Sequence, residues 1–312
     1  MVKVYKSKRA EQQVLQSYQS ILEMWPVEFQ EQRIPTKYGI THCIISGTPD
    51  RPPLLLFHGV GDNSAVMWAL NIEELSRHFY CIAVDTLGGP GKSRPNEYFT
   101  RSSFDQVDWI NQIIDYFQYE RVHLAGVSNG AYMAYNYTVT HSHRVYRTVC
   151  MEGGMVTKPF KTMVRTLLMM FPEICIPTHH NLLRILKKLS SPHSRVFTQY
   201  PWLGDHLALL MKSHNQQAMF VHKVEKYNRE EGDIAGNKLY FLVAEHRIEL
   251  QRDFLRILDE GKFTYKVIPD AGHGINHEQP ERVNAEIVSF LLEESRRMKG
   301  ADPSAIQPGT QP

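Results

Sequence analysis

One serine lies in a setting that could make it a nucleophile. Ser128 is the centre of the pentapeptide GVSNG (residues 126–130), which follows the apolar run Val122 to Ala125 and precedes Ala131 to Thr140, a segment with small residues near its start. A serine on a sharp strand-to-helix turn needs small neighbours because the backbone there is crowded, and the turn presents the hydroxyl at the edge of the sheet. The sequence therefore predicts that Ser128 is a catalytic nucleophile.

A glycine-rich tetrapeptide could stabilise the negative charge that forms when a serine attacks a carbonyl group. It is the sequence HGVG (residues 58–61), and it directly follows the apolar run Leu54 to Phe57. A loop of this kind can bring a backbone N–H group to the reacting carbonyl. We therefore assign the oxyanion hole to the backbone N–H groups of Val60 and Asn129.

One of the fifteen histidines lies where a general base is needed. His273 is in the sequence AGHG (residues 271–274), after the apolar run Tyr265 to Ile268 and before a terminal helix that we expect to begin near Gln279. A histidine on a loop at the carboxyl end of a strand can reach a serine on a neighbouring strand, while its second nitrogen bonds an acid. A serine nucleophile, an oxyanion hole and a histidine together indicate acyl transfer.

A second histidine near His273 raises the question of a metal site. His277 lies four residues further on, but neither histidine is in a segment with a clear helical pattern, and the sequence contains no HExxH motif. We therefore expect no metal site and no cofactor.

The elements that position these residues follow from the apolar pattern. Short apolar runs alternate with longer amphipathic segments, which is typical of parallel strands covered on both faces. Before them, Ala10 to Met24 predicts an amphipathic helix, and strand patterns at Gln32 to Pro35 and Ile40 to Ser46 predict a hairpin. The six predicted parallel strands are Leu54 to Phe57, Cys81 to Val84, Val122 to Ala125, Val145 to Met151, Leu239 to Val243 and Tyr265 to Ile268.

The alternation stops between about residues 154 and 236. This segment has helical periodicity and no clear strand pattern, and a structureless loop of its length would be unusual in a compact domain. It therefore predicts an inserted helical region, which we call the cap. The cap contains an apolar row that could contact a substrate, although such rows more often pack onto the main domain; it consists of Met163, Leu167, Leu168, Met169, Met170 and Phe171.

Composition excludes several classes of protein. The 312 residues include 35 basic and 33 acidic side chains spread along the chain, so nucleic acid is not an expected partner. No apolar stretch reaches the roughly 20 residues that a membrane span needs, and the basic, polar start does not resemble a signal peptide. The four cysteines form no CxxC pair, which favours a reducing compartment. We expect a cytoplasmic protein, and the sequence leaves its oligomeric state open.

Over about residues 30 to 298 the chain resembles the α/β-hydrolase fold family. The resemblance rests on the order of the HGVG loop, a glycine-rich loop at Asp85 to Ser93, the GVSNG turn and a terminus that contains His273, Glu278, Pro280 and Glu281. Within that family the chain is most similar to bacterial carboxylesterases of the naproxen-ester-hydrolysing kind, through Trp25 to Val27, Tyr38 to His42 and Phe57 to Asn71.

This resemblance implies an eight-stranded, mostly parallel sheet with helices on both faces and an inserted helical cap. We accordingly divide the chain into an N-terminal helical extension (1–29), the α/β-hydrolase core (30–153 and 237–298), the cap (154–236) and a disordered tail (299–312).

The acid of the catalytic triad departs from the family's usual pattern. Members of the family usually carry it just after the penultimate strand, where this chain has Arg247. An arginine cannot accept a hydrogen bond from the histidine. We predict that the acid is Glu152, which ends the strand after the GVSNG turn and its helix and resembles the acid of some members of the fold in its offset from the nucleophile. Glu245 and Glu249 are the alternatives.

These residues predict a serine hydrolase that cleaves a carboxylic ester, or a lactone, through an acyl-enzyme on Ser128. The expected partner is a small-molecule ester or lactone substrate. Two alternatives use the same triad: a thioesterase and a carbon–carbon bond hydrolase. A third is a noncatalytic ligand-binding protein that keeps the fold.

Overall fold

The computed structural model describes residues 2–157, 159–246 and 253–300. The chain begins with helix α1 (Lys8–Glu23), whose first turn is capped by the Ser7 hydroxyl, which accepts a hydrogen bond from the Ala10 N–H. Strands β1 (Phe29–Thr36) and β2 (Gly39–Ser46) then form the predicted antiparallel hairpin. β1 starts before the predicted strand because its pairing with β2 extends back to Phe29, which lies opposite Ser46.

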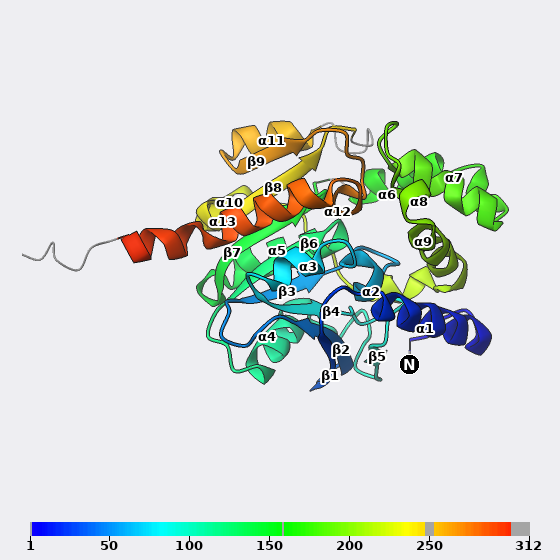
Figure 1. Cartoon of the computed structure of the whole chain (residues 1–312), viewed down its shortest axis with the longest axis horizontal. Coiled ribbons are helices and arrows are strands. Elements are labelled where there is room, and N and C mark those ends of the chain that lie inside the picture. Colours follow the sequence, from blue (N-terminus) through cyan, green and yellow to red (C-terminus); the bar gives the residue numbers. More distant parts are fainter. Residues whose placement is uncertain (1, 158, 247–252, 301–312) are drawn as a thin grey trace, which may run out of the picture.

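All six predicted parallel strands are present (Figure 1). They are β3 (Pro53–Phe57), β4 (Tyr80–Val84), β6 (Val122–Val127), β7 (Val145–Met151), β8 (Leu239–Ala244) and β9 (Thr264–Ile268). The strand order is β1-β2-β4-β3-β6-β7-β8-β9, and β2 pairs antiparallel with β4. The sheet has nine strands instead of the expected eight, because the two-residue strand β5 (Arg94–Pro95) also pairs with β2.

Helices cover both faces of this sheet, as the continuous apolar strands require. Successive side chains of a strand point to opposite faces. Leu54 and Leu56 of β3 accordingly belong to the cluster that includes helices α1, α3 (Ile72–Ser76) and α13 (Pro280–Gly300). Leu55 and Phe57 belong to the opposite cluster, with α4 (Gln106–Tyr116) and α5 (Asn129–Thr140). Helix α11 (Phe254–Glu260) packs in a third cluster with β8.

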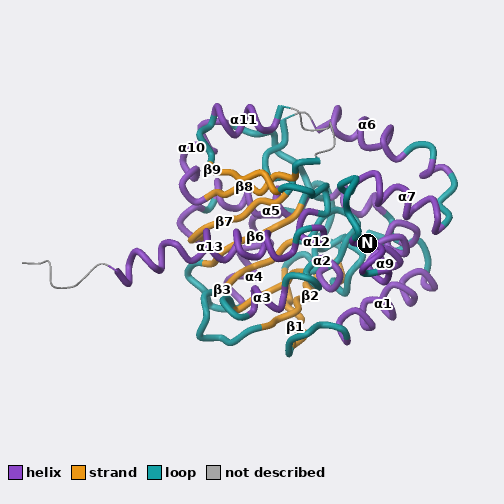
Figure 2. The backbone as a smooth tube through the Cα atoms, turned by 45° about the horizontal axis from the view of Figure 1, so that its top comes forward, coloured by secondary structure: helices purple, strands orange, loops and turns teal. Residues whose placement is uncertain are grey.

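The chain between β7 and β8, which we call the cap, consists of helices and connecting loops, and its described residues add no strand to the sheet (Figure 2). Helix α9 (Pro201–Ser213) packs against both α7 (His179–Leu189) and α1, and the Ser17 hydroxyl of α1 is 2.7 Å from Nδ1 of His206 in α9. The N-terminal helix is therefore packed against the cap. The α-helices of the cap are α6 (Pro159–Met170), α7 (His179–Leu189), α8 (Val196–Gln199), α9 (Pro201–Ser213) and α10 (Arg229–Ala235).

Two expectations about the cap and the tail need correction. Leu167, Leu168 and Phe171 are 55%, 69% and 60% exposed, so half of the apolar row does not pack onto the main domain, whereas Met170 packs against the small cluster around Leu182 and Ile185. Helix α13 extends to residue 300, so residues 299 and 300 are helical, and the rest of the predicted tail lies outside the described residues. Among the helices of the described chain, none is long and apolar enough to cross a membrane.

Candidate active site

Ser128 occupies a strained turn between β6 and α5. Its backbone angles are φ 56° and ψ −114°, a region that residues with a side chain rarely adopt. The Ser128 N–H donates to the Met151 carbonyl oxygen at 2.8 Å, which ties the turn to the end of β7. Backbone strain of this kind is retained where the surrounding structure enforces it, and it is concentrated at functional sites.

Two glycines let this turn form. A Cβ atom on Gly126 would lie 2.2 Å from the Gly130 carbonyl oxygen, and one on Gly130 would lie 2.2 Å from the Phe57 carbonyl oxygen. No real Cβ contact is that short, so both positions of the GVSNG motif require glycine for close backbone packing. The turn is thereby held against the end of β3.

Glu152 follows β7 at the same edge of the sheet. It has a left-handed φ of 49°, and its N–H donates to the Leu242 carbonyl oxygen at 3.0 Å. Its side chain is buried: Oε1 accepts a hydrogen bond from the Ala244 N–H at 2.7 Å, and Oε2 is 3.6 Å from His273 Nδ1. The carboxylate is therefore fixed by one oxygen and directed at the histidine with the other.

His273 lies on the loop between β9 and the short helix α12 (Ile275–Glu278). Its backbone N–H donates to the Leu189 carbonyl oxygen of the cap at 2.7 Å, and its side chain is 32% exposed. Glu278 strengthens this junction, because its two carboxylate oxygens accept from the N–H groups of Gly272 and Ser191. Burial raises the pKa of Glu278 above its ordinary value.

The alternative acids are placed differently. Glu245 is half exposed, and its Oε2 accepts a hydrogen bond from the Asp270 N–H at 2.9 Å. Glu249 and Arg247 lie outside the described residues. Among the described carboxylates, the one that forms an ion pair with His273 is Glu152.

The loop with the predicted oxyanion hole is close to Ser128. A Cβ atom on Gly59 would lie 3.6 Å from the Ser128 Cβ atom, and Val60 next to it is 53% exposed. Asn129 is the first residue of α5, where the backbone N–H has no partner within the helix. The assignment of the oxyanion hole to the N–H groups of Val60 and Asn129 stays a prediction.

His58 connects the HGVG loop to the chain after β4. Its Nε2 accepts a hydrogen bond from the Thr86 N–H at 3.0 Å, so the proton resides on Nδ1, which donates to the Gly59 carbonyl oxygen at 2.8 Å. Burial lowers the pKa of His58, which keeps the ring neutral. Sequence reasoning named the HGVG loop but missed this role of its histidine.

A second buried network, also missed from the sequence, supports the same loop. Asp85 is fully buried, and its carboxylate accepts hydrogen bonds from the N–H groups of Ser64 and Lys92 and from the Tyr18 hydroxyl. Burial alone would raise the pKa of Asp85, but these bonds and the neighbouring His42 hold it well below its ordinary value. The signal for this network was the glycine-rich sequence after β4: a Cβ atom on Gly91 would lie 2.4 Å from the Asp85 carboxylate.

His277 has a structural position. It belongs to α12, it is buried, and its Nε2 lies 3.1 Å and 3.0 Å from the carbonyl oxygens of Val66 and Met67. A nitrogen that donates to carbonyl oxygens carries a proton and has no lone pair for a metal. Burial lowers the pKa of His277 to about 4.

This pKa predicts a loss of stability in mild acid. An unfolded histidine takes up a proton below a pH of about 6.5, whereas the folded His277 does not until about 4, so its contribution to stability is lost as the pH falls between these values. At pH 5 the loss is on the order of 2 kcal/mol. Urea unfolding of the wild type and of His277→Gln at pH 7.5 and pH 5 measures it, and we expect a shallower pH dependence in the variant. Equal slopes would show that His277 does not titrate as the structure implies.

Comparison with known proteins agrees with this architecture. A family model for the alpha/beta hydrolase fold matches residues 52–174. Carboxylesterase YbfK of Bacillus subtilis is 27% identical over 296 residues, which cover 88% of this chain and 92% of the relative. The crystal structure of that species' carboxylesterase CesB (YbfK) has a TM-score of 0.76 at 25% identity, and its naproxen esterase (carboxylesterase NP) has a TM-score of 0.77 at 25% identity. Each of the two structural matches covers 91% of this chain and 99% of the solved one.

The strand order, the strained serine turn between β6 and α5 and these likenesses lead to one assignment. The chain has an α/β-hydrolase fold and is similar over most of its length to bacterial carboxylesterases.

Proposed function

We propose that this protein is a serine hydrolase that cleaves a carboxylic ester through an acyl-enzyme on Ser128. The observation that carries the proposal is the convergence of three residues at one edge of the sheet. Ser128 and Glu152 end the adjacent parallel strands β6 and β7, both with left-handed backbone angles, and Glu152 is paired with His273 from the loop after β9. The similarity to carboxylesterases over most of the chain supports the same chemistry.

The reaction follows from these positions. Ser128 Oγ attacks the carbonyl carbon of the ester while its proton passes to His273 Nε2. The N–H groups of Val60 and Asn129 stabilise the oxyanion, and the Glu152 carboxylate stabilises the imidazolium. Collapse of the intermediate breaks the ester C–O bond, and the leaving alkoxide takes the proton from His273. Water, activated by the same histidine, then attacks the acyl-enzyme and releases the carboxylic acid.

The alternatives have weaker support. Lactones are cyclic esters and use the same steps, so they are included in the proposed substrate class. A thioester would differ only in its leaving group, and a carbon–carbon bond hydrolase would share the fold, which hosts many chemistries. A noncatalytic binding protein would have no need for strain at both Ser128 and Glu152.

We also propose that the cap, residues 154–236, covers the active site and shapes the acyl or alcohol pocket. Its segment at Leu189 is hydrogen-bonded to the loop of His273.

We further propose a cytoplasmic location, since all four cysteines are free thiols and three of them are buried.

Labelling with a fluorophosphonate probe tests whether Ser128 is an activated nucleophile. The wild type should react stoichiometrically at Ser128, and Ser128→Ala should not react, while Ser102→Ala, a change of an exposed serine, should label as the wild type does. Hydrolysis of matched esters, thioesters and lactones of graded acyl length then defines the substrate class. A folded wild type that is not labelled would contradict the proposal and favour the binding protein, and turnover of thioesters alone would replace the ester by a thioester.

A further inference from the structure

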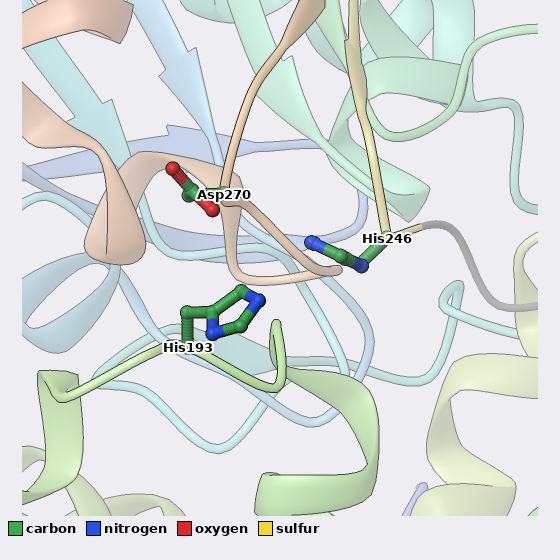
Figure 3. Close-up of side chains that lie close together, drawn as sticks. All are labelled: His193, His246 and Asp270. Carbon is green, nitrogen blue, oxygen red and sulfur yellow. The ribbon is translucent and has the colours of Figure 1, made fainter.

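Three potential metal ligands meet beside the active site. Nitrogen atoms of His193 and His246 and a carboxylate oxygen of Asp270 all lie within 4.8 Å of one another (Figure 3). They come from three separate segments: His193 from the cap between α7 and α8, His246 from the end of β8, and Asp270 from the loop after β9. Figure 3 shows the two imidazole rings and the carboxylate grouped around one space between these segments.

The ligand set and its spacing suit a transition-metal ion. Zn²⁺ is bound by imidazole nitrogen and carboxylate oxygen at about 2.0–2.2 Å, and in tetrahedral geometry this places neighbouring ligand atoms about 3.3 Å apart. Small side-chain rotations bring atoms within 4.8 Å to that separation, because His193 and Asp270 are exposed and His246 is only half-buried. We propose that His193, His246 and Asp270 form a binding site for one Zn²⁺ ion, with water in the fourth position.

The backbone around these residues is already fixed. The His246 N–H donates to the Ala271 carbonyl oxygen at 2.9 Å, and the Asp270 N–H donates to the Glu245 carboxylate at 2.9 Å. Gln279 donates to the Asp270 carbonyl oxygen at 3.1 Å. In the described part of the chain, no lysine or arginine forms an ion pair with the Asp270 carboxylate. The backbone at His246 and at Asp270 is thus held in place by hydrogen bonds to the core.

The third ligand connects the site to the cap. His193 is close to Ser191, whose N–H donates to Glu278, and the neighbouring Leu189 accepts from the His273 N–H. An ion bound by His193, His246 and Asp270 would therefore crosslink the cap to the end of β8 and to the loop that carries His273. None of its ligands is Ser128, Glu152 or His273, so ester hydrolysis does not require the ion. Its function is to hold the cap against the core at the edge of the active site.

Calorimetric titration of ZnCl₂ into the metal-free chain, without a polyhistidine tag, tests the site. We expect one ion per chain and a higher melting temperature in the presence of Zn²⁺. His193→Ala, His246→Ala and Asp270→Asn should each weaken binding by at least about tenfold, since even residues that only orient a ligand cost 10- to 100-fold. Asparagine tolerates the left-handed φ of 53° at position 270, so the Asp270 variant should fold. Co²⁺ should give the absorption bands of a tetrahedral site in the wild type and not in these three variants.

Two further variants serve as controls. His180→Ala changes an exposed histidine of α7 and should bind Zn²⁺ as the wild type does. His273→Ala should also retain binding, because His273 is not a ligand of the proposed site. If the wild type binds no Zn²⁺, or if His273→Ala alone abolishes binding, the proposal is wrong. Loss of esterase activity in any of these variants, without loss of zinc affinity, would concern the proposed function and not this site.

Discussion

Replacing Ser128 by alanine is expected to lower kcat by about a millionfold, as nucleophile removal does in other serine hydrolases. The expectation follows from the position of the side chain. Ser128 is partly exposed at the turn between β6 and α5, and within the described part of the chain its side chain does not cap helix α5. Its removal therefore takes away the attacking oxygen and leaves the packing unchanged. Steady-state hydrolysis of an activated ester, with circular dichroism to verify folding, measures the effect.

Ser128→Gly separates loss of chemistry from loss of structure. Glycine adopts φ 56°, ψ −114° without the cost that a Cβ atom imposes, so this variant should be inactive but more stable than the wild type by about 1 kcal/mol. Retention of more than a few per cent of the wild-type activity in either variant would show that Ser128 is not the nucleophile.

The parallel sheet could be predicted because its strands are buried on both faces. β3, β6 and β8 have almost no exposed residue, so each appears in the sequence as a continuous apolar run. β1 was harder to delimit, since most of its residues are polar and not buried, and its first residues are recognised only by their pairing with β2. The two-residue β5 has no pattern of its own and depends wholly on its contact with β2.

The apolar row of α6 shows a limit of sequence patterns. Periodicity identifies which residues share one side of a helix, but it does not reveal whether another element covers that side. Leu168 and Phe171 have the spacing of core residues, yet both side chains are more than half exposed. The proposed zinc ligands illustrate the same limit, because His193, His246 and Asp270 are far apart in the sequence and only the fold brings them together.

The sequence limits the candidates for the acid of the triad to three glutamates, but the spacing of these residues along the chain does not decide among them. The choice depends on where a side chain points after its strand ends, and at Glu152 the left-handed backbone turns the carboxylate towards β8 and the loop of His273. Glu245 follows the next strand in the sheet, but its carboxylate binds the Asp270 N–H instead. These contacts support the prediction that Glu152 is the acid.

Glu152→Gln is accordingly expected to lower kcat by about three to four orders of magnitude. Glutamine has nearly the same shape, and its amide oxygen can still accept the hydrogen bond from the Ala244 N–H. The amide nitrogen would then face His273 Nδ1 as a donor, which favours the wrong tautomer of the imidazole and leaves the imidazolium of the transition state unsupported. KM should change little, because no contact with the substrate is lost.

Glu245→Gln and Glu249→Gln, assayed in parallel, identify the acid by comparison. Each should reduce kcat by less than about tenfold, since the Glu245 side chain can keep its bond to Asp270 as an amide and Glu249 is not the predicted partner of His273. If Glu245→Gln or Glu249→Gln loses most of its activity while Glu152→Gln turns over normally, the acid lies after β8, at the position that is usual in α/β-hydrolases. The pairing of Glu152 with His273 would then be a structural contact, and the strain at residue 152 would serve the packing between β7 and β8 instead of catalysis.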